Sequence, residues 1–206
     1  MGNELRLTLV ADGSSDRALL PIIQWTVRQH SDAAMVIAWA DLARMPTRPT
    51  ALNARIAHAI DLYPCDLLFV HRDAERDPRS TRVAEITAAC AGSGAGGVVP
   101  VVPVRMTEAW LLFDESVIRN AAGNPLGTVR LRLPRVKSLE RVPDPKEILH
   151  QALLTASELG ARRRDRFDVR WAANRVASLA EDFSPLRLLP SFRSFEFDTA
   201  AALARL

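Results

Sequence analysis

The chain has 206 residues, of which 48% are hydrophobic, so it is long enough and apolar enough to bury a sizeable core. No stretch approaches the roughly 18 apolar residues of a membrane span, and we expect no membrane partner. The two cysteines, Cys65 and Cys90, lack the spacing of a zinc site or a disulfide framework, which favours a cytoplasmic location.

The net charge of +3 is unevenly distributed. Residues 1–127 carry 12 basic and 14 acidic side chains, whereas residues 128–194 carry 14 basic and 8 acidic ones. This separation is typical of an enzyme acting on nucleic acid, in which carboxylates hold metal and arginines bind phosphates. An ordinary solvated surface can show the same separation, so both interpretations stay open.

The first 115 residues alternate between strand-like and helix-like segments. Apolar runs that stop at polar or turn-forming residues predict strands over residues 5–11, 33–40, 65–71 and 98–104. Helical spacing of apolar residues predicts helices between them, over residues 15–30, 50–63 and 79–90. Pro100 and Pro103 in the fourth run are typical of an edge strand.

Strands joined by helical crossovers run parallel, and such crossovers are right-handed. We therefore expect an α/β fold, with an open, mostly parallel four-stranded sheet flanked by helices, formed by residues 1–121. Residues 122–206 should form an irregular segment and a helical extension packed on this core, as one domain overall. In that part, residues 128–133 alternate as a strand would, and Asp144 before Pro145 is typical of a helix start. Helical spacing returns over residues 166–180 and 194–206.

Acidic residues follow three of the predicted strands. Asp12 follows the first strand, Asp73 and Glu75 follow the third, and Glu108 follows the fourth. Because the carboxyl ends of parallel strands lie at one edge, we expect these carboxylates to converge. Asp73 and Glu75 are two positions apart, so in an extended segment they would point to the same side. Carboxylate oxygens suit Mg²⁺ or Mn²⁺, which predicts a metal site in which Asp12 and Asp73 also take part in catalysis.

Each candidate also has an ordinary structural interpretation. Asp12 precedes a glycine, and Asp-Gly is a strong turn signal. Asp16 suits the first turn of a helix whatever its function. Glu108 can be a solvated helix residue, and His71 at a strand end is more typical of a hydrogen-bonded structural residue than of a ligand.

Arginines near these acids, or in the basic part of the chain, are candidates for binding substrate phosphate because a guanidinium can donate two parallel hydrogen bonds to it. They are Arg72, Arg76, Arg82, Arg162 and Arg163. A solvated helix face would carry the same residues, so that alternative stays open. The four tryptophans are expected mostly in the core.

The acid-Gly pair after the first strand and the acid-x-acid motif after the third resemble the Toprim signature of topoisomerases, primases and OLD-type nucleases. Three further motifs resemble those of a Toprim-like family of unknown function, which is related to RloB-type proteins and often encoded beside ATPases in bacterial defence loci. These motifs are VPVRMTEAWLLFD (Val102–Asp114), DPKEIL (Asp144–Leu149) and LPSF (Leu189–Phe192). The resemblance covers nearly the whole chain.

The resemblance implies a Mg-dependent nuclease or related phosphoryl-transfer domain that acts on nucleic acid, in a bacterial antiviral defence system and with an ATPase encoded nearby. It assigns Asp12, Asp73 and Glu75 to the Toprim acids, and Glu108 and Trp110 to the EAW motif. No particular oligomeric state is predicted.

The chain departs from the Toprim pattern at two positions, with Asp12 where glutamate is usual and Glu75 where aspartate is usual. Each change moves a carboxylate by about one methylene, and a misplacement of about 1 Å can cost on the order of 10²-fold in rate. The alternative is therefore a degenerate, non-catalytic Toprim domain that binds nucleic acid or a partner ATPase.

Two other acid-bearing α/β folds fit the residues less well. A receiver domain needs a lysine at the end of a late strand, and the first lysine here is Lys137. A haloacid-type phosphatase needs Asp-x-Asp directly after its first strand, where this chain has Asp12, Gly13 and Ser14. No Walker-type phosphate-binding loop occurs either.

Overall fold

A computed structural model describes residues 4–47 and 49–206 of the chain. Its sheet consists of β1 (Leu5–Val10), β2 (Met35–Trp39), β3 (Leu67–His71) and β4 (Val98–Val101). The strands are all parallel and lie in the order β2-β1-β3-β4. The predicted α/β fold with an open parallel sheet is therefore confirmed, and so is the edge position of the strand that contains Pro100.

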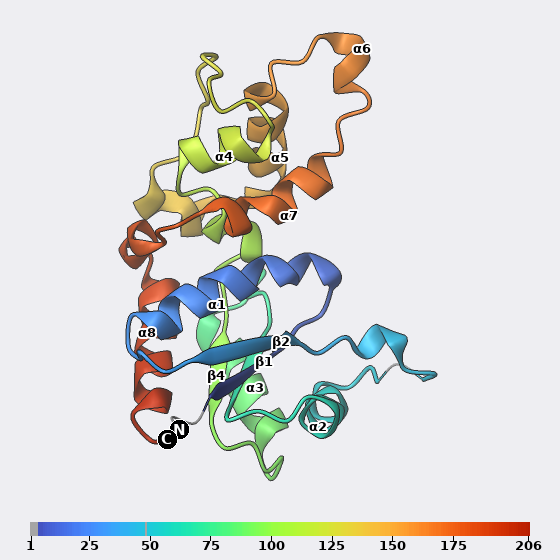
Figure 1. The fold of residues 1–206 in the computed structure, drawn as a ribbon, viewed down its shortest axis with the longest axis vertical. Helices are drawn as coiled ribbons and strands as arrows, with labels where there is room; N and C mark the ends of the chain where they lie inside the picture. The colour runs from blue at the N-terminus through green and yellow to red at the C-terminus, as the bar shows by residue number, and fades with distance from the viewer. Residues whose placement is uncertain (1–3, 48) are drawn as a thin grey trace.

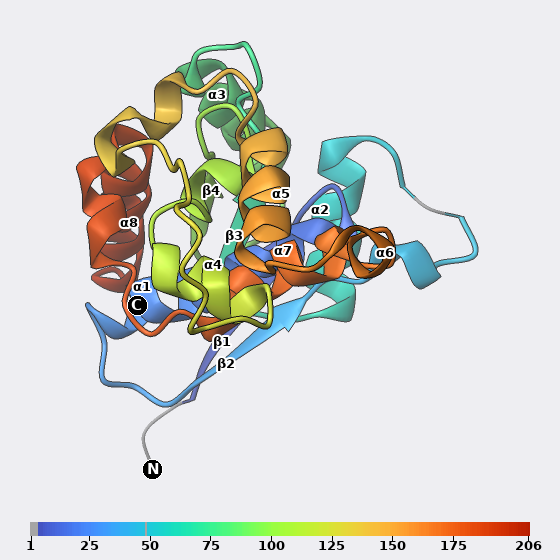
Figure 2. The ribbon, with the colours of Figure 1, turned by 90° about the horizontal axis from the view of Figure 1, so that it is seen from above.

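Helices cover both faces of the sheet (Figures 1 and 2). Successive strand residues point to opposite faces, so Leu67 and Phe69 join one core cluster while Leu68 and Val70 join the other. The first cluster includes side chains from α1 (Leu19–Arg28) and α8 (Pro190–Leu203). The second includes side chains from α2 (Leu52–Leu62) and α3 (Arg79–Cys90). Each face of the sheet thus packs against its own pair of helices.

The remaining α-helices stand above α1 in the upper part of Figure 1, on the side of the sheet that α1 and α8 cover. They are α4 (Glu115–Ala121), α5 (Pro145–Ala156), α6 (Ala161–Arg164) and α7 (Val169–Leu179). Short 3-10 helices connect the elements: η1 (Ser14–Ala18), η2 (Leu42–Arg44), η3 (Thr107–Trp110), η4 (Val136–Arg141) and η5 (Ser184–Leu188). After η5 the chain returns to the sheet as α8, so the C-terminal part covers both the strand ends and one sheet face.

Aromatic side chains join the upper helices to the sheet. Trp110 is fully buried, and its ring centroid lies 5.3 Å from that of Phe192 and 5.6 Å from that of Phe195. Phe195 in turn contacts Phe69 of β3 edge-on. The Trp110 indole nitrogen donates a hydrogen bond to Ser191 Oγ at 3.1 Å, which satisfies its one polar atom. The segment after β4 is therefore fixed to α8 and to the sheet through one core.

Residues 128–133, whose alternation left a strand open beside the predicted irregular segment, form no strand. Side chains rather than a neighbouring strand satisfy their backbone. The Glu158 carboxylate accepts hydrogen bonds from the amides of Thr128 and Val129, and Arg119 donates to the Val129 carbonyl. A segment with alternating residues forms a strand only when a neighbouring strand accepts and donates its backbone hydrogen bonds.

Two helix starts illustrate the effect of capping. Asp144 Oδ1 accepts a hydrogen bond from the Glu147 amide at 2.9 Å, so α5 begins where the sequence predicts. The first helix is different, because η1 precedes it and α1 begins only at Leu19. In η1 the Asp16 carboxylate turns back and accepts from the Gly13 amide at 2.8 Å. Among the described residues, no helix is long and apolar enough to cross a membrane.

Candidate metal centre

Three carboxylates from three strand ends line one pocket of about 150 Å³. Asp16 lies in η1 after β1, Asp73 lies two residues after β3, and Glu108 lies in η3 after β4. Because β3 is hydrogen-bonded to both β1 and β4, the three loops meet at the same edge of the sheet. The expected convergence of acids at this edge therefore occurs, but only two of the four predicted acids take part.

Asp73 occupies the centre of this arrangement. Its Oδ1 accepts a hydrogen bond from the Thr107 amide at 2.9 Å, and about a third of the side chain remains exposed. Burial raises the pKa of Asp73 to about 6, and the Asp16 and Glu108 carboxylates act in the same direction. His71 and the Thr107 amide oppose this rise in the pKa. Asp73 is thus a carboxylate held among other carboxylates, an environment that a cation would relieve.

His71 lies buried beneath the acids. Its Nδ1 lies 2.9 Å from the Val101 carbonyl oxygen, and because a carbonyl can only accept, Nδ1 carries the proton of that bond. Its Nε2 therefore faces the pocket, at 3.3 Å from Thr107 Oγ1, 3.5 Å from Asp73 Oδ1 and 3.8 Å from Asp16 Oδ1. One imidazole thus touches both loops that carry the central acids.

The rest of the pocket wall is mixed, with Ser15, Met106 and Leu111 from the segments around η1 and η3 and three residues from the C-terminal helices. Lys146 Nζ lies 3.9 Å from Glu108 Oε1, and the lysine side chain is about half exposed. Ala173 and Asn174 of α7 complete the wall. The pocket therefore combines buried and partly buried acids with one cation and one amide that can reach solvent.

Asp12 does not line this pocket. Its carboxylate faces the buried guanidinium of Arg55, which also donates to the Ala11 carbonyl, and it pairs with Arg72 Nη1 at 3.3 Å. Asp12 therefore lies in a network of ion pairs on the side of the strand end that faces α2. The prediction that Asp12 joins Asp73 has to be corrected in this respect, and Asp16 takes the place that it was expected to fill.

Glu75 points away from the pocket as well. Its backbone has a positive φ of 54°, so the segment turns there instead of continuing in the extended form that would align Glu75 with Asp73. The Glu75 amide donates to the Arg105 carbonyl at 2.8 Å, which holds this turn against the loop after β4. The Glu75 side chain is 72% exposed and lies 3.8 Å from an Arg82 nitrogen. The predicted Asp73 and Glu75 pair is therefore separated by a local change of backbone conformation.

The candidate phosphate-binding arginines fall into two groups. Arg72 and Arg82 are partly buried and both pair with Glu85, at 3.3 and 3.0 Å, while Arg82 also pairs with Asp77 at 3.2 Å. Their guanidinium groups therefore hold the loop after β3 in place. The exposed candidates are Arg76, Arg162 and Arg163.

Sequence reasoning underrated three residues of the pocket. Asp16 was interpreted as a helix-start residue, which it also is, since it accepts from the Gly13 amide. His71 was interpreted as structural, and Lys146 was not considered for the site at all. The available signal for Asp16 and His71 was their position at the ends of β1 and β3. Lys146 had no such signal, because its place depends on how α5 packs above the sheet.

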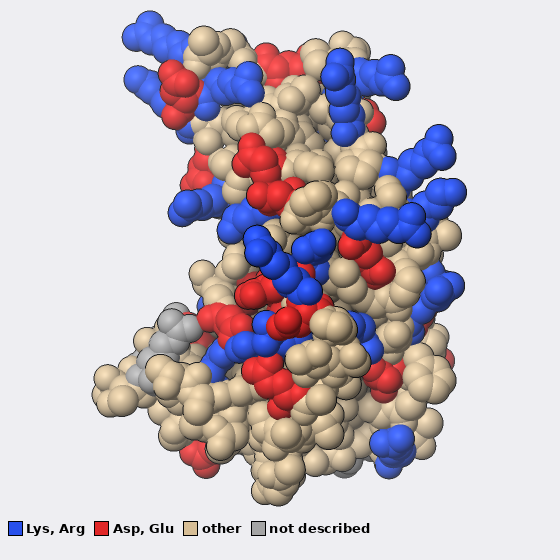
Figure 3. Space-filling model, turned by 180° about the vertical axis from the view of Figure 1, so that it is seen from behind, with Lys and Arg blue, Asp and Glu red and all other residues tan. Residues whose placement is uncertain are grey.

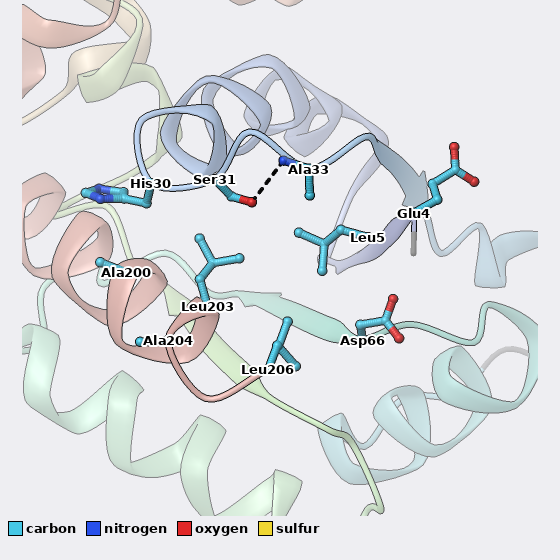
Figure 4. A pocket seen from close by; sticks show the side chains of 10 residues that line it. All are labelled: Glu4, Leu5, His30, Ser31, Ala33, Asp66, Ala200, Leu203, Ala204 and Leu206. Atoms are coloured by element: carbon cyan, nitrogen blue, oxygen red, sulfur yellow. Dashed lines mark hydrogen bonds between the residues drawn. The ribbon is translucent and has the colours of Figure 1, made fainter. Parts of the chain in front are cut away.

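A larger cavity of about 500 Å³ lies at the opposite, amino-terminal ends of the strands (Figure 4). The α8 side of it is apolar, with Leu203 and Leu206 facing Leu5. The Asp66 carboxylate at its rim accepts hydrogen bonds from the Arg6 amide and guanidinium, which lower the pKa of Asp66. This cavity is larger than the acidic pocket, but of its two carboxylates, Glu4 and Asp66, the second is already paired with Arg6, so it is the weaker candidate for a metal.

Figure 3 shows a hollow at mid-height on the back of the molecule, where acidic side chains gather with basic ones around them. Within the described ranges, no three His, Cys, Asp or Glu side chains are grouped closely enough to bind one metal ion directly.

Comparison with protein-family models, with curated proteins and with solved structures found no match for the chain.

Proposed function

We propose that this chain is a Mg²⁺- or Mn²⁺-dependent nuclease, or a related phosphoryl-transfer domain, with Asp16, Asp73 and Glu108 as its metal-binding residues. The observation that carries the proposal is their meeting in one pocket although they come from three separate loops. The resemblance of the strand-end acids and the EAW motif to Toprim proteins of bacterial defence systems supports the same reaction class. It also extends the proposal to nucleic acid as substrate and to a partner ATPase.

The residues present fit a hard divalent cation. Mg²⁺ prefers carboxylate oxygens, keeps several water molecules and needs only one or two carboxylates from the protein. Two of the three acids are therefore sufficient, which is compatible with the absence of a three-residue cluster among the described side chains. A bound Mg²⁺ would supply charge stabilisation at phosphate oxygens and an acidified water.

The protein groups around the acids have separate tasks. His71 Nε2 lies 3.8 Å from Asp16 Oδ1 and 3.5 Å from Asp73 Oδ1, so its ring links the two loops that carry these acids. The Thr107 amide fixes Asp73 Oδ1 by a hydrogen bond of 2.9 Å. Lys146, half exposed at the rim, can contact a phosphate oxygen of a bound substrate.

A second candidate function is a non-catalytic module that binds nucleic acid or a partner ATPase. The ion pairs of Asp12 with Arg55 and Arg72 favour it, because they neutralise the acid that follows the first strand. As such a module, the protein has an acidic pocket without catalytic activity and binds the nucleic acid or the ATPase through other surfaces.

A cleavage assay separates the two functions. Wild-type protein is incubated with labelled single-stranded DNA, duplex DNA, RNA and tRNA, in Mg²⁺, in Mn²⁺ and in EDTA. We expect cleavage of at least one substrate in metal, none in EDTA, and a loss on the order of 10²-fold for Asp73→Asn. Asparagine keeps the acceptor for the Thr107 amide, so this variant tests the charge and not the hydrogen bond.

The matched control is Glu75→Gln, which changes an exposed carboxylate outside the pocket. It should retain wild-type activity. If no substrate is cut in either metal, the nuclease proposal is wrong and the binding module remains.

A further inference from the structure

Trp171 is exposed, contrary to the expectation that the tryptophans lie mostly in the core. It lies in the first turn of α7, with 57% of its surface open to solvent. The Arg175 guanidinium lies over its ring, 4.3 Å from the centroid, and the Asp168 carboxylate caps the helix by accepting from the Trp171 amide at 2.9 Å. The ring is therefore held in place by Arg175, and more than half of its surface remains open to solvent.

The surroundings of Trp171 are strongly basic. Residues 161–175, here called the α6–α7 segment, contain six arginines and two aspartates. Five of the arginines are exposed and, within the described part of the chain, make no side-chain hydrogen bond or ion pair: Arg162, Arg163, Arg164, Arg166 and Arg170. In the sheet half, by contrast, Arg55, Arg72 and Arg82 are each neutralised by carboxylates. The α6–α7 segment thus carries positive charge that the chain itself does not use.

The exposed face of α7 connects this segment to the acidic pocket. Trp171, Asn174 and Arg175 are exposed or partly exposed at helical spacings of three and four, while Ala172, Ala173 and their neighbours pack inward. Asn174, one turn after Trp171, lines the pocket that contains Asp73. An elongated ligand lying along this face would therefore reach from the tryptophan to the acids.

We propose that the α6–α7 segment binds single-stranded nucleic acid, with one base stacked on Trp171 and the backbone phosphates on its arginines. The inference rests on the proposed function, for which it names the substrate class. An aromatic ring beside a basic strip is the arrangement by which single strands are bound without regard to sequence. A duplex offers no unstacked base to the ring, so the geometry favours a single strand.

An anionic membrane surface is the competing partner for a basic, tryptophan-bearing region. Membrane binding draws on a broad apolar face, whereas here one ring stands among charged side chains. In Figure 3, basic side chains project at the upper left, where the half-turn from Figure 1 brings α6. The charge lies on a protruding element and not around an apolar patch.

The test measures binding in EDTA, so that it does not depend on cleavage. Fluorescence anisotropy of labelled 15-nucleotide single strands and of a duplex of equal length gives the dissociation constants. We expect the wild type to prefer the single strand, Trp171→Ala to lose about 10-fold or more in affinity, and Trp171→Phe to retain most of it. Binding should also quench tryptophan fluorescence, and this quench should be lost in Trp171→Phe.

Arg163→Gln should weaken binding, whereas Arg193→Gln, an exposed arginine on α8, serves as the matched control and should not. Circular dichroism verifies that each variant is folded. Binding of the duplex with equal or greater affinity, or binding that is indifferent to Trp171→Ala, would overturn the inference even if cleavage is observed. Binding to phosphatidylserine vesicles without binding to oligonucleotides would overturn it in favour of a membrane. Trp171-dependent binding without cleavage in any metal would support it while refuting the nuclease.

Discussion

The acidic pocket and the α6–α7 segment use charge in opposite ways. The pocket gathers its carboxylates from three loops, and each has a partner within the chain. Asp73 has the Thr107 amide, Asp16 the Gly13 amide and Glu108 the Lys146 ammonium group. The α6–α7 segment takes its charge from consecutive residues, and five of its arginines have no partner among the described side chains. The charges of the pocket are held by the fold, whereas those of the α6–α7 segment are left open to solvent.

The largest expected effect concerns which acids form the pocket. Asp16→Asn should reduce metal-dependent cleavage on the order of 10²-fold, because it removes a carboxylate from the pocket. Asp12→Asn should have a much smaller effect, since Asp12 pairs with Arg55 and Arg72. Initial rates are measured at a temperature at which both variants are folded. Equal losses in the two variants would show that the pocket is not the centre of the chemistry.

The next effect concerns the free energy of unfolding and its dependence on pH. The pKa of Asp73 is raised to about 6, above its ordinary value of 3.8, so the folded state prefers the neutral acid. The contribution of Asp73 to the free energy of unfolding is fully present below about pH 4 and is lost as the pH rises through 6. In EDTA, Asp73→Asn should therefore be more stable than wild type by about 1–2 kcal/mol at pH 7.5, a value reduced for the exposure of the side chain.

Denaturant unfolding at pH 4 and at pH 7.5 measures this difference, which should vanish at the lower pH. Added Mn²⁺ should stabilise the wild type and not Asp73→Asn. If Asp73→Asn is less stable than wild type at pH 7.5, burial and the neighbouring carboxylates do not destabilise the charged form of Asp73.

A smaller effect belongs to the α6–α7 segment. Arg163→Gln combined with Arg166→Gln should reduce the dependence of log affinity on log salt concentration by about 2, because two phosphate contacts release fewer counterions. The measurement is a titration of labelled single strands at several salt concentrations. An unchanged slope would mean that these arginines do not face the phosphates.

The smallest effect is expected at the pocket rim. Lys146 Nζ lies 3.9 Å from Glu108 Oε1, and the lysine is half exposed, so the pair is worth only about 0.2–1 kcal/mol. Lys146→Gln removes a cation that competes with the metal. Calorimetric titration should therefore show that Lys146→Gln binds Mn²⁺ about 1.4- to 5-fold more tightly than the wild type. This ratio of dissociation constants is the free energy of the ion pair converted to an affinity. Weaker binding would indicate that Lys146 organises the site.

The sequence predicted the sheet well because its signals are local and strong. The apolar runs of β1 and β3 stop at polar residues, and parallel pairing then follows from the crossovers. Residues 128–133, for which a strand was the alternative to an irregular segment, are irregular because pairing needs a neighbouring strand. Glu158 and Arg119 bond the backbone of residues 128 and 129 instead. Apolar and polar residues do alternate there, but the alternation does not reveal whether a neighbouring strand is present.

The carboxylates converge at the predicted edge of the sheet, but two of the residues that meet there differ from those expected. Glu75 turns outward because its backbone adopts a positive φ, a conformation that the acid-x-acid spacing does not reveal. Asp16 turns inward because η1 precedes α1. The tryptophans were expected mostly in the core from their spacing, yet Trp171 is exposed because Ala172 and Ala173 supply the inward face of α7.

A crystal soaked in Mn²⁺ and read for anomalous density tests the central claim most directly. The expected result is a peak in the pocket, bound by at least two of Asp16, Asp73 and Glu108. A peak at Asp12 or Glu75 with none in the pocket would contradict it.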